Sequence, residues 1–334
     1  MHMVWPFGRV ARRLGVPPGS RIGLQIGRME SASPELRVPW NAAMNAIAEI
    51  VELTGCSELG MVAARATQPL DLGPLARVVL PQPTLGHALR IHDHFYRLLT
   101  DGLSWQQEDA GDLVLRHLRS HDGSMIVPAV QEFSFAVWTT LARFLSGRKD
   151  IGPSEIRFTH AAPRDLTAYA IFRCPVKFGA SDATFAIAKP LLSLPSIFAD
   201  AVEAKAFELR LQATLDALPQ PTTRELVVEA LASWLSEGTP KPDATARRLG
   251  LTPRQLERRL KREGTSHREL LDETRHRLAT EYLQRGELST AEIAERLGFA
   301  SVHSFHRAHR RIAGTSPGAI RPTRAKAKLP DRSA

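Results

Sequence analysis

The chain has 334 residues, enough for two or three domains of roughly 100–200 residues each, and 43% of them are hydrophobic. Its two cysteines, Cys56 and Cys174, exclude a disulfide framework and lack metal-ligand spacing, which indicates a reducing cytosol. No stretch approaches the ~20 apolar residues of a transmembrane helix, and the basic N-terminus lacks the long apolar core of a signal peptide. We therefore expect a soluble, cytoplasmic protein without a membrane partner.

The positive charge of the chain is concentrated in its last third. Lys and Arg total 44 against 35 Asp and Glu, a net charge of +9. Residues 222–334 contain 22 basic and 14 acidic residues, whereas residues 1–221 contain 22 and 21. A basic region can be an ordinary solvent-exposed surface, or it can attract the phosphate backbone of a nucleic acid. Where such a region coincides with a DNA-binding motif, as it does below, nucleic-acid binding is the favoured interpretation.

The first two thirds of the chain mix helices and strands. We expect residues 1–33 to be irregular because they contain Pro17, Pro18 and several glycines, and residues 34–217 to form one α/β or α+β domain. The apolar spacing predicts helices over 39–53, 84–99, 128–146, 163–173 and 198–217. It also predicts two strands joined by a turn over 103–118, a strand over 155–160 and a hairpin over 176–188.

The remainder of the chain is predicted to be all-α. Residues 218–223, LPQPTT, have the composition of a linker. Residues 224–322 form the second expected domain, and residues 323–334 a disordered basic tail. The helices are predicted over 223–236, 243–249, 252–263, 267–284, 290–297 and 301–313.

Two helix-turn-helix segments lie in this second domain, over 244–266 and 291–317. Each has a short helix, a turn glycine (Gly250 or Gly298) and a second helix rich in basic residues. In such a unit the second helix enters the major groove of DNA. The intervening helix over 267–284 would span about 27 Å and could hold two reading helices about one DNA turn, roughly 34 Å, apart.

Each recognition helix has an inward and an outward face. In the first, Leu256 and Leu260 face inward, and in the second Phe305 does. The predicted DNA-binding residues are those left outside: Arg254, Gln255, Arg258, Arg259, His303, Ser304, His306, Arg307 and Arg310. Arg is the usual bidentate partner of guanine and Gln of adenine, so these residue types suit base reading.

The domain resembles the DNA-binding domain of AraC/XylS-type bacterial transcription regulators. The resemblance rests on RLGLTPRQLERRLKREGTS, on the helix from Arg275 to Leu283 and on GFASVHSFHRAHRRIAGTSPGAIR. It implies that bases are read two residues before and two after the inward Leu or Phe. These positions are Arg254, Arg258, His303 and Arg307, and Ser304 adjoins them.

The sequence departs from the family at His309, where Phe is usual. His303, His306 and His309 recur every third residue, a spacing that could suggest a metal site. No carboxylate or Cys accompanies them, so we interpret two as groove contacts and the third as a buried imidazole.

The N-terminal region resembles the arabinose-binding-like domain found in one branch of the same family. The similar stretches are LTGCSELG (53–60), PTLGHALR (83–90) and FTHAAPRDLTAYAIFRCPVKFGA (158–180). The resemblance implies an effector-sensing domain of about 180 residues but fixes no ligand.

Two other functions of this region stay open: a module that only dimerises, or an enzyme fused to a DNA-binding domain. His92, Asp93 and His94 could suggest metal or acid–base chemistry, but adjacent helical residues point apart. Cys174 could be a redox switch, although a lone Cys among apolar residues is more often a small core residue. No phosphate-binding loop, nucleophile elbow or zinc motif is present.

We therefore predict a transcription regulator, an activator, that is not an enzyme and holds no cofactor or metal. Its expected partners are double-stranded DNA, a small-molecule effector, RNA polymerase and a second copy of the chain.

Overall fold

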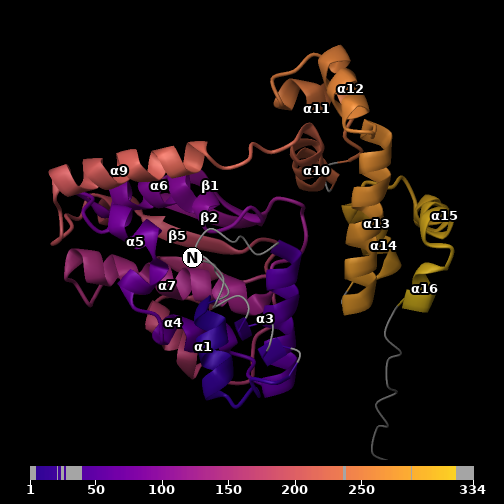
Figure 1. Cartoon of the computed structure of the whole chain (residues 1–334). Helices are drawn as coiled ribbons and strands as arrows, with labels where there is room; N and C mark the ends of the chain where they lie inside the picture. The colour runs from indigo at the N-terminus through magenta and orange to yellow at the C-terminus, as the bar shows by residue number, and fades with distance from the viewer. Residues whose placement is uncertain are drawn as a thin grey trace, which may run out of the picture. The chain divides into compact units, whose positions relative to one another are not determined.

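The computed structural model describes residues 5–20, 22–23, 26–27, 40–235, 238–286 and 288–320 (Figure 1). The chain divides into two compact units, Met1–Ser120 with Ile126–Pro219, and His121–Met125 with Gln220–Ala334. Each unit has its own hydrophobic core. The basic tail expected over 323–334 lies outside the described residues. No helix in the described ranges is long and apolar enough to cross a membrane.

The first unit contains a five-stranded sheet in the order β1-β2-β5-β3-β4. Its strands are β1 Leu103–Ala110, β2 Leu113–Ser120, β3 Glu155–Arg157, β4 Val176–Lys177 and β5 Thr184–Ala188. Only β3 and β4 are parallel; the other neighbours are antiparallel. The first two strands form the expected hairpin, whose turn has Gly111 at a φ of 61°. The unit is thus α+β.

Helices complete the first unit. They are α1 Trp5–Arg13, α3 Trp40–Thr54, α4 Leu59–Arg65, α5 Pro74–Val79, α6 Leu85–Phe95, α7 Pro128–Ser146, α8 Lys189–Leu192 and α9 Ala201–Asp216, with 3-10 turns η1 Pro69–Leu72, η2 Tyr96–Leu98 and η3 Thr167–Phe172. Thr84 caps α6 as predicted, accepting a hydrogen bond from the His87 amide. The buried ring of Phe135 on α7 lies 5.4–5.8 Å from the rings of Trp105, Phe158 and Phe185, which joins this helix to the sheet.

Three expectations for this unit were wrong. Residues 5–13 are helical rather than irregular, because Phe7 and Val10 lie on one face of α1 and are buried in the core. Over 163–173 only η3 forms, since the Asp165 carboxylate accepts the Thr167 amide and so competes with a longer helix. β4 and β5 are not a hairpin, because β5 is paired on both sides, by β2 and by β3.

The second unit is all-helical in its described part. Its helices are α10 Thr223–Trp234, α11 Pro242–Arg248, α12 Pro253–Arg262, α13 His267–Arg285, α14 Thr290–Arg296, α15 Val302–Ala313 and α16 Pro317–Ile320. The predicted helices are confirmed to within one or two residues at their ends. The longest, α13, contacts α10, α14, α15 and α16, and its Leu270, Leu278 and Leu283 lie in the core of the unit.

Candidate DNA-binding surface and effector pocket

Both helix-turn-helix units turn at a glycine in the left-handed region. Gly250, between α11 and α12, and Gly298, between α14 and α15, each have a φ of 65°. At Gly298 the space is limited as well, because an added Cβ would lie 2.8 Å from the carbonyl oxygen of Leu235. Any other residue at either turn would therefore strain the corner that positions the recognition helix.

The two recognition helices begin in the same way. Thr252 and Gln255 form a capping box at the start of α12, and Ser301 and Ser304 form one at the start of α15. The Gln255 carbonyl oxygen accepts from the Thr252 amide at 2.8 Å, and the Ser304 hydroxyl donates to the Ser301 carbonyl at 2.7 Å. Gln255 and Ser304 thus have a structural role, and their contact with DNA stays a prediction.

The capping boxes place the expected base-reading residues at equivalent positions. Arg254 and His303 are the second residues of α12 and α15, and Arg258 and Arg307 are the sixth. Residues four apart project from one face of a helix, so each helix presents one such pair on its exposed side. The opposite side is buried through Leu256 and Leu260 in α12. In α15 it is buried through Phe305 and His309.

Several exposed arginines of the recognition helices make no contact with other described residues that holds the fold together. Within the described part of the chain, no ion pair or hydrogen bond engages the side chains of the exposed residues Arg254, Arg258, Arg259, Arg307 and Arg310. Other arginines are committed to the fold. Arg311 pairs with Asp272 at 2.7 Å, and Arg224 pairs with Glu273 at 2.5 Å. The uncommitted group lies on the two recognition helices, where it is available for phosphates or bases.

Arg275 on α13 fixes the second turn. Its guanidinium donates to the carbonyl oxygens of Leu297 at 2.9 Å and Gly298 at 2.8 Å, and it lies 4.4 Å from the centroid of the Phe299 ring. These carbonyls follow α14 and precede α15. The Arg275 side chain therefore ties the corner of the second helix-turn-helix to the central helix.

His309 is buried, as interpreted from the sequence, with 3% of its surface exposed. Its Nδ1 lies 3.1 Å from the Thr315 carbonyl oxygen, and its ring centroid lies 5.8 Å from that of Phe305. The ring of His276 on α13 is 5.7 Å away. Burial and the neighbouring His309 lower the pKa of His276, so the folded unit favours a neutral imidazole there. Among the described residues no group of three metal-ligating side chains is present.

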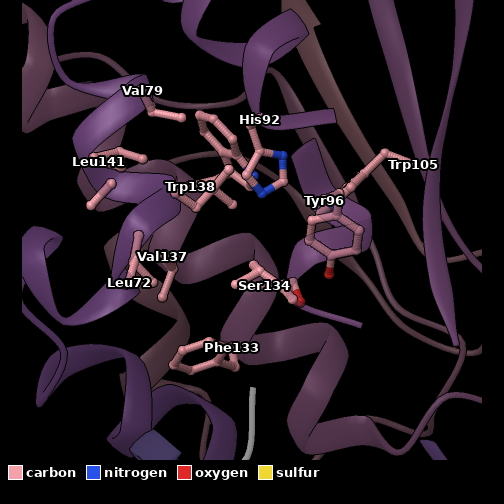
Figure 2. A pocket seen from close by; sticks show the side chains of 13 residues that line it. Leu72, Val79, His92, Tyr96, Trp105, Phe133, Ser134, Val137, Trp138 and Leu141 are labelled. Atoms are coloured by element: carbon pink, nitrogen blue, oxygen red, sulfur yellow. The ribbon is translucent and has the colours of Figure 1, made fainter. Parts of the chain in front are cut away.

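The first unit contains a largely apolar cavity with about 520 Å³ of empty space, including its open mouth (Figure 2). One wall is apolar, with Leu72, Val79, Val137 and Leu141 from η1, α5 and α7. The facing side carries the polar and aromatic groups: His92, Tyr96, Trp105, Ser134 and Trp138. An apolar lining with a few polar groups is typical of small-molecule sites.

A buried ion pair lies beside the polar end of this cavity. Arg116 of β2 is fully buried, and its guanidinium lies 4.3 Å from the Trp105 ring centroid and 5.4 Å from that of Trp138. It donates to Asp93, which also lies 3.0 Å from His92 Nδ1. Burial is the largest influence on His92 and lowers its pKa, so its imidazole is neutral at physiological pH.

Sequence reasoning did not find this cavity. Its lining comes from η1, α5, α6, η2, β1 and α7, and no short motif spans these elements. The HDH run gave one signal. His92 is turned inward, whereas His94 is exposed and contacts Gln212 at 2.7 Å, as the divergence of adjacent helical residues requires. Cys174 does not suit redox chemistry, because burial raises the pKa of its thiol to about 11.

Each of the two units matches a known protein family. The family model described as the arabinose-binding domain of AraC transcription regulators, N-terminal, matches residues 20–196, more than half of the chain. The chain belongs to the AraC family of transcription regulators. A second model, described as a helix-turn-helix domain, matches residues 245–323. This family member is a DNA-binding transcription regulator with an N-terminal ligand-binding domain.

The curated relatives that the chain resembles are named as regulators. The Ornithine utilization regulator of Pseudomonas aeruginosa is 29% identical over 80% of this chain and 80% of its own length. The transcriptional regulator VirS of Mycobacterium tuberculosis is 29% identical over 56% of this chain and 54% of its own. The crystal structure of the transcriptional regulator CdpR from Pseudomonas aeruginosa matches 89% of this chain and 95% of its own, at 24% identity and a TM-score of 0.38.

The two faces of α12 predict opposite results for two substitutions. Arg258→Ala removes an exposed, uncommitted side chain and should change the free energy of unfolding by no more than about 0.5 kcal/mol while abolishing specific DNA binding. Leu260→Ala leaves a cavity in the core and should cost roughly 2–5 kcal/mol. Circular-dichroism melting, with titration against DNA fragments selected by the wild-type protein, measures both. If Arg258→Ala destabilised the protein while Leu260→Ala left its stability unchanged, the assignment of the buried and exposed faces of α12 would be wrong.

The pair of neighbouring histidines, His276 and the buried His309, predicts a pH dependence of stability. Because the pKa of His276 is lowered in the folded state, the unfolded chain binds more protons as the pH falls below about 6.5, and stability decreases there. His309→Phe removes the neighbouring imidazole, so the melting temperature should fall less between about pH 7.5 and about pH 5.5 than in the wild type. His306→Phe, on the exposed face of α15, is the control. An equal fall in all three proteins would contradict the role of the pair.

Proposed function

We propose that the protein activates transcription by reading two adjacent major grooves on one face of the DNA, one with each recognition helix. The observation that carries the proposal is the pair of equivalent exposed faces, each with a basic or imidazole side chain at the second position and an Arg at the sixth. Arg254, Arg258, His303 and Arg307 would contact base edges in this arrangement.

The remaining predicted DNA-binding residues of the two helices, all exposed except the half-buried Ser304, would contact the DNA backbone or neighbouring base edges. They are Gln255, Arg259, Ser304, His306 and Arg310. Arg259 and Arg310 carry charge without a partner in the described chain, so they suit phosphate oxygens. Contacts of this kind make affinity fall with salt concentration without changing sequence preference.

We propose that a small-molecule effector bound in the first unit controls DNA engagement. The family assignment and the apolar cavity beside a few polar groups support this proposal over a purely dimerising module or an enzyme. A screen of the full-length protein against metabolites, read as a shift in melting temperature, tests it. A stabilising metabolite that also changes DNA affinity supports sensing, turnover of that metabolite would indicate an enzyme, and no shift at all would favour the dimerising module.

We also propose that the active form is a cytoplasmic homodimer that contacts RNA polymerase at its promoters. Support for the dimer comes from α9, where Val202 and Leu209 are 82% and 62% exposed. Seven residues apart, they share one face of the helix, and such apolar surface is typical of a protein interface. Sedimentation of the full-length protein should give the mass of a dimer, and a strictly monomeric protein would contradict this part of the proposal.

Arg307→Ala tests base reading by the second helix. Loss of a bidentate contact should cost about 1–3 kcal/mol at one base position and relax specificity there. Selection of bound sequences from a randomised DNA pool measures the preference. Arg210→Ala removes the same charge from an exposed position of α9 and serves as the control. An unchanged base preference in Arg307→Ala would show that α15 does not read the sequence at this residue.

A further inference from the structure

The cavity of the first unit has a lining without ionisable carboxylates, lysines or arginines. The lining consists of aliphatic and aromatic side chains, and its polar groups belong to His92, Tyr96, Trp105, Ser134 and Trp138. Transfer of a charged group into such surroundings costs several kcal/mol unless an opposite charge meets it. The lining therefore disfavours charged ligands, including amino acids.

The nearby charges do not change this conclusion, because they neutralise each other. Arg116 and Asp93 form an ion pair, and Asp93 also holds His92 Nδ1. The Arg116 guanidinium makes cation–π contacts with the rings of Trp105 and Trp138, so these rings already have a cationic partner. A ligand cation would be repelled by this guanidinium. Its Nε and Nη1 have no hydrogen-bond partner in the described chain, but Arg116 is not among the residues that line the cavity, so it offers a ligand anion no direct contact there.

The polar end of the cavity offers both a hydrogen-bond acceptor and a donor. Because the Asp93 carboxylate only accepts, His92 donates from Nδ1 and presents an unprotonated Nε2, which has no partner among the described residues. The Trp105 Nε1–H is a buried donor beside the Tyr96 hydroxyl. Tyr96 adds a hydroxyl that stays neutral, since burial raises the pKa of its phenol.

We propose that the effector of this regulator is an uncharged, mainly apolar molecule carrying a hydroxyl group, bound in this cavity. A hydroxyl is the smallest group that can donate to His92 Nε2 and accept from Trp105 Nε1 or the Tyr96 hydroxyl. Its apolar remainder lies against the wall formed by η1, α5 and α7 (Figure 2). The inference rests on the effector control proposed above and names the chemical class of the effector.

A matched series of probes tests charge and hydrogen bonding separately. Octan-1-ol, octanoate and octylammonium share one chain and differ in charge, and 1-methoxyheptane is an isomer of octan-1-ol without the donor hydrogen. L-ornithine represents charged amino acids. Binding to the full-length protein is followed by tryptophan fluorescence, since Trp105 and Trp138 line the cavity, and by the shift in melting temperature. Octan-1-ol should bind about tenfold more tightly, or better, than each of the other four.

Two substitutions assign the binding to this cavity. Val137→Trp fills it, and Leu53→Trp introduces the same side chain at a position of α3 that is 59% exposed. Octan-1-ol binding should be lost in the first variant and retained in the second. Three results would overturn the proposal. The first is equal binding of octan-1-ol to both variants, and the second is no binding of octan-1-ol at all. The third is binding of octanoate, octylammonium, L-ornithine or 1-methoxyheptane that is as tight as that of octan-1-ol.

The same proteins separate this proposal from effector control itself. The metabolite screen and DNA titration use the full-length wild type. A charged metabolite that stabilises the protein and changes its DNA affinity, with unchanged effect in Val137→Trp, would leave effector control intact and refute the cavity and ligand class assigned here. Absence of any effect of any metabolite on DNA affinity would refute effector control.

Discussion

The central helix α13 connects the two helix-turn-helix segments: it packs directly against α15, and it reaches the first segment through a side-chain contact with α11. Its nineteen residues span about 28 Å and carry the leucines around which the second unit packs. At its first residue, His267 lies 3.0 Å from the Thr245 hydroxyl of α11. Farther along, Arg275 and Asp272 hold the corner and the recognition helix of the second helix-turn-helix. Reading of two grooves at a fixed spacing requires this rigid connection.

Arginine has two distinct uses in the second unit. Arg275 satisfies two carbonyls that the turn at Gly298 leaves without helical partners, and Arg248 lies 4.4 Å from the Trp234 ring. Such residues contribute to the fold through hydrogen bonds and ring contacts within the unit. The arginines on the exposed faces of α12 and α15 make no comparable contact in the described chain. Their substitution should therefore lower the affinity for DNA without lowering the stability of the free protein.

Local sequence signals predicted the second unit well because its structure is set by local rules. Capping residues such as Thr252 and Ser301, the turn glycines and the helical spacing of Leu256 and Leu260 act within a few residues of one another. The first unit depends on distant pairing instead. Strand β5 lies between β2 and β3, and the cavity joins Leu72 to Leu141 through elements far apart in the chain. Neither the pairing nor the lining has a short motif, so the sequence located the domain but not its pocket.

The central claim is that two helices of one chain read two adjacent major grooves. Methylation interference at guanine N7, performed on DNA fragments selected by the full-length protein, tests it directly because Arg258 and Arg307 are placed to contact guanine edges. The account predicts two clusters of interfering guanines on one face of the duplex, about one helical turn or roughly 10 base pairs apart. A single cluster, unaffected by which recognition helix carries an alanine, would contradict it.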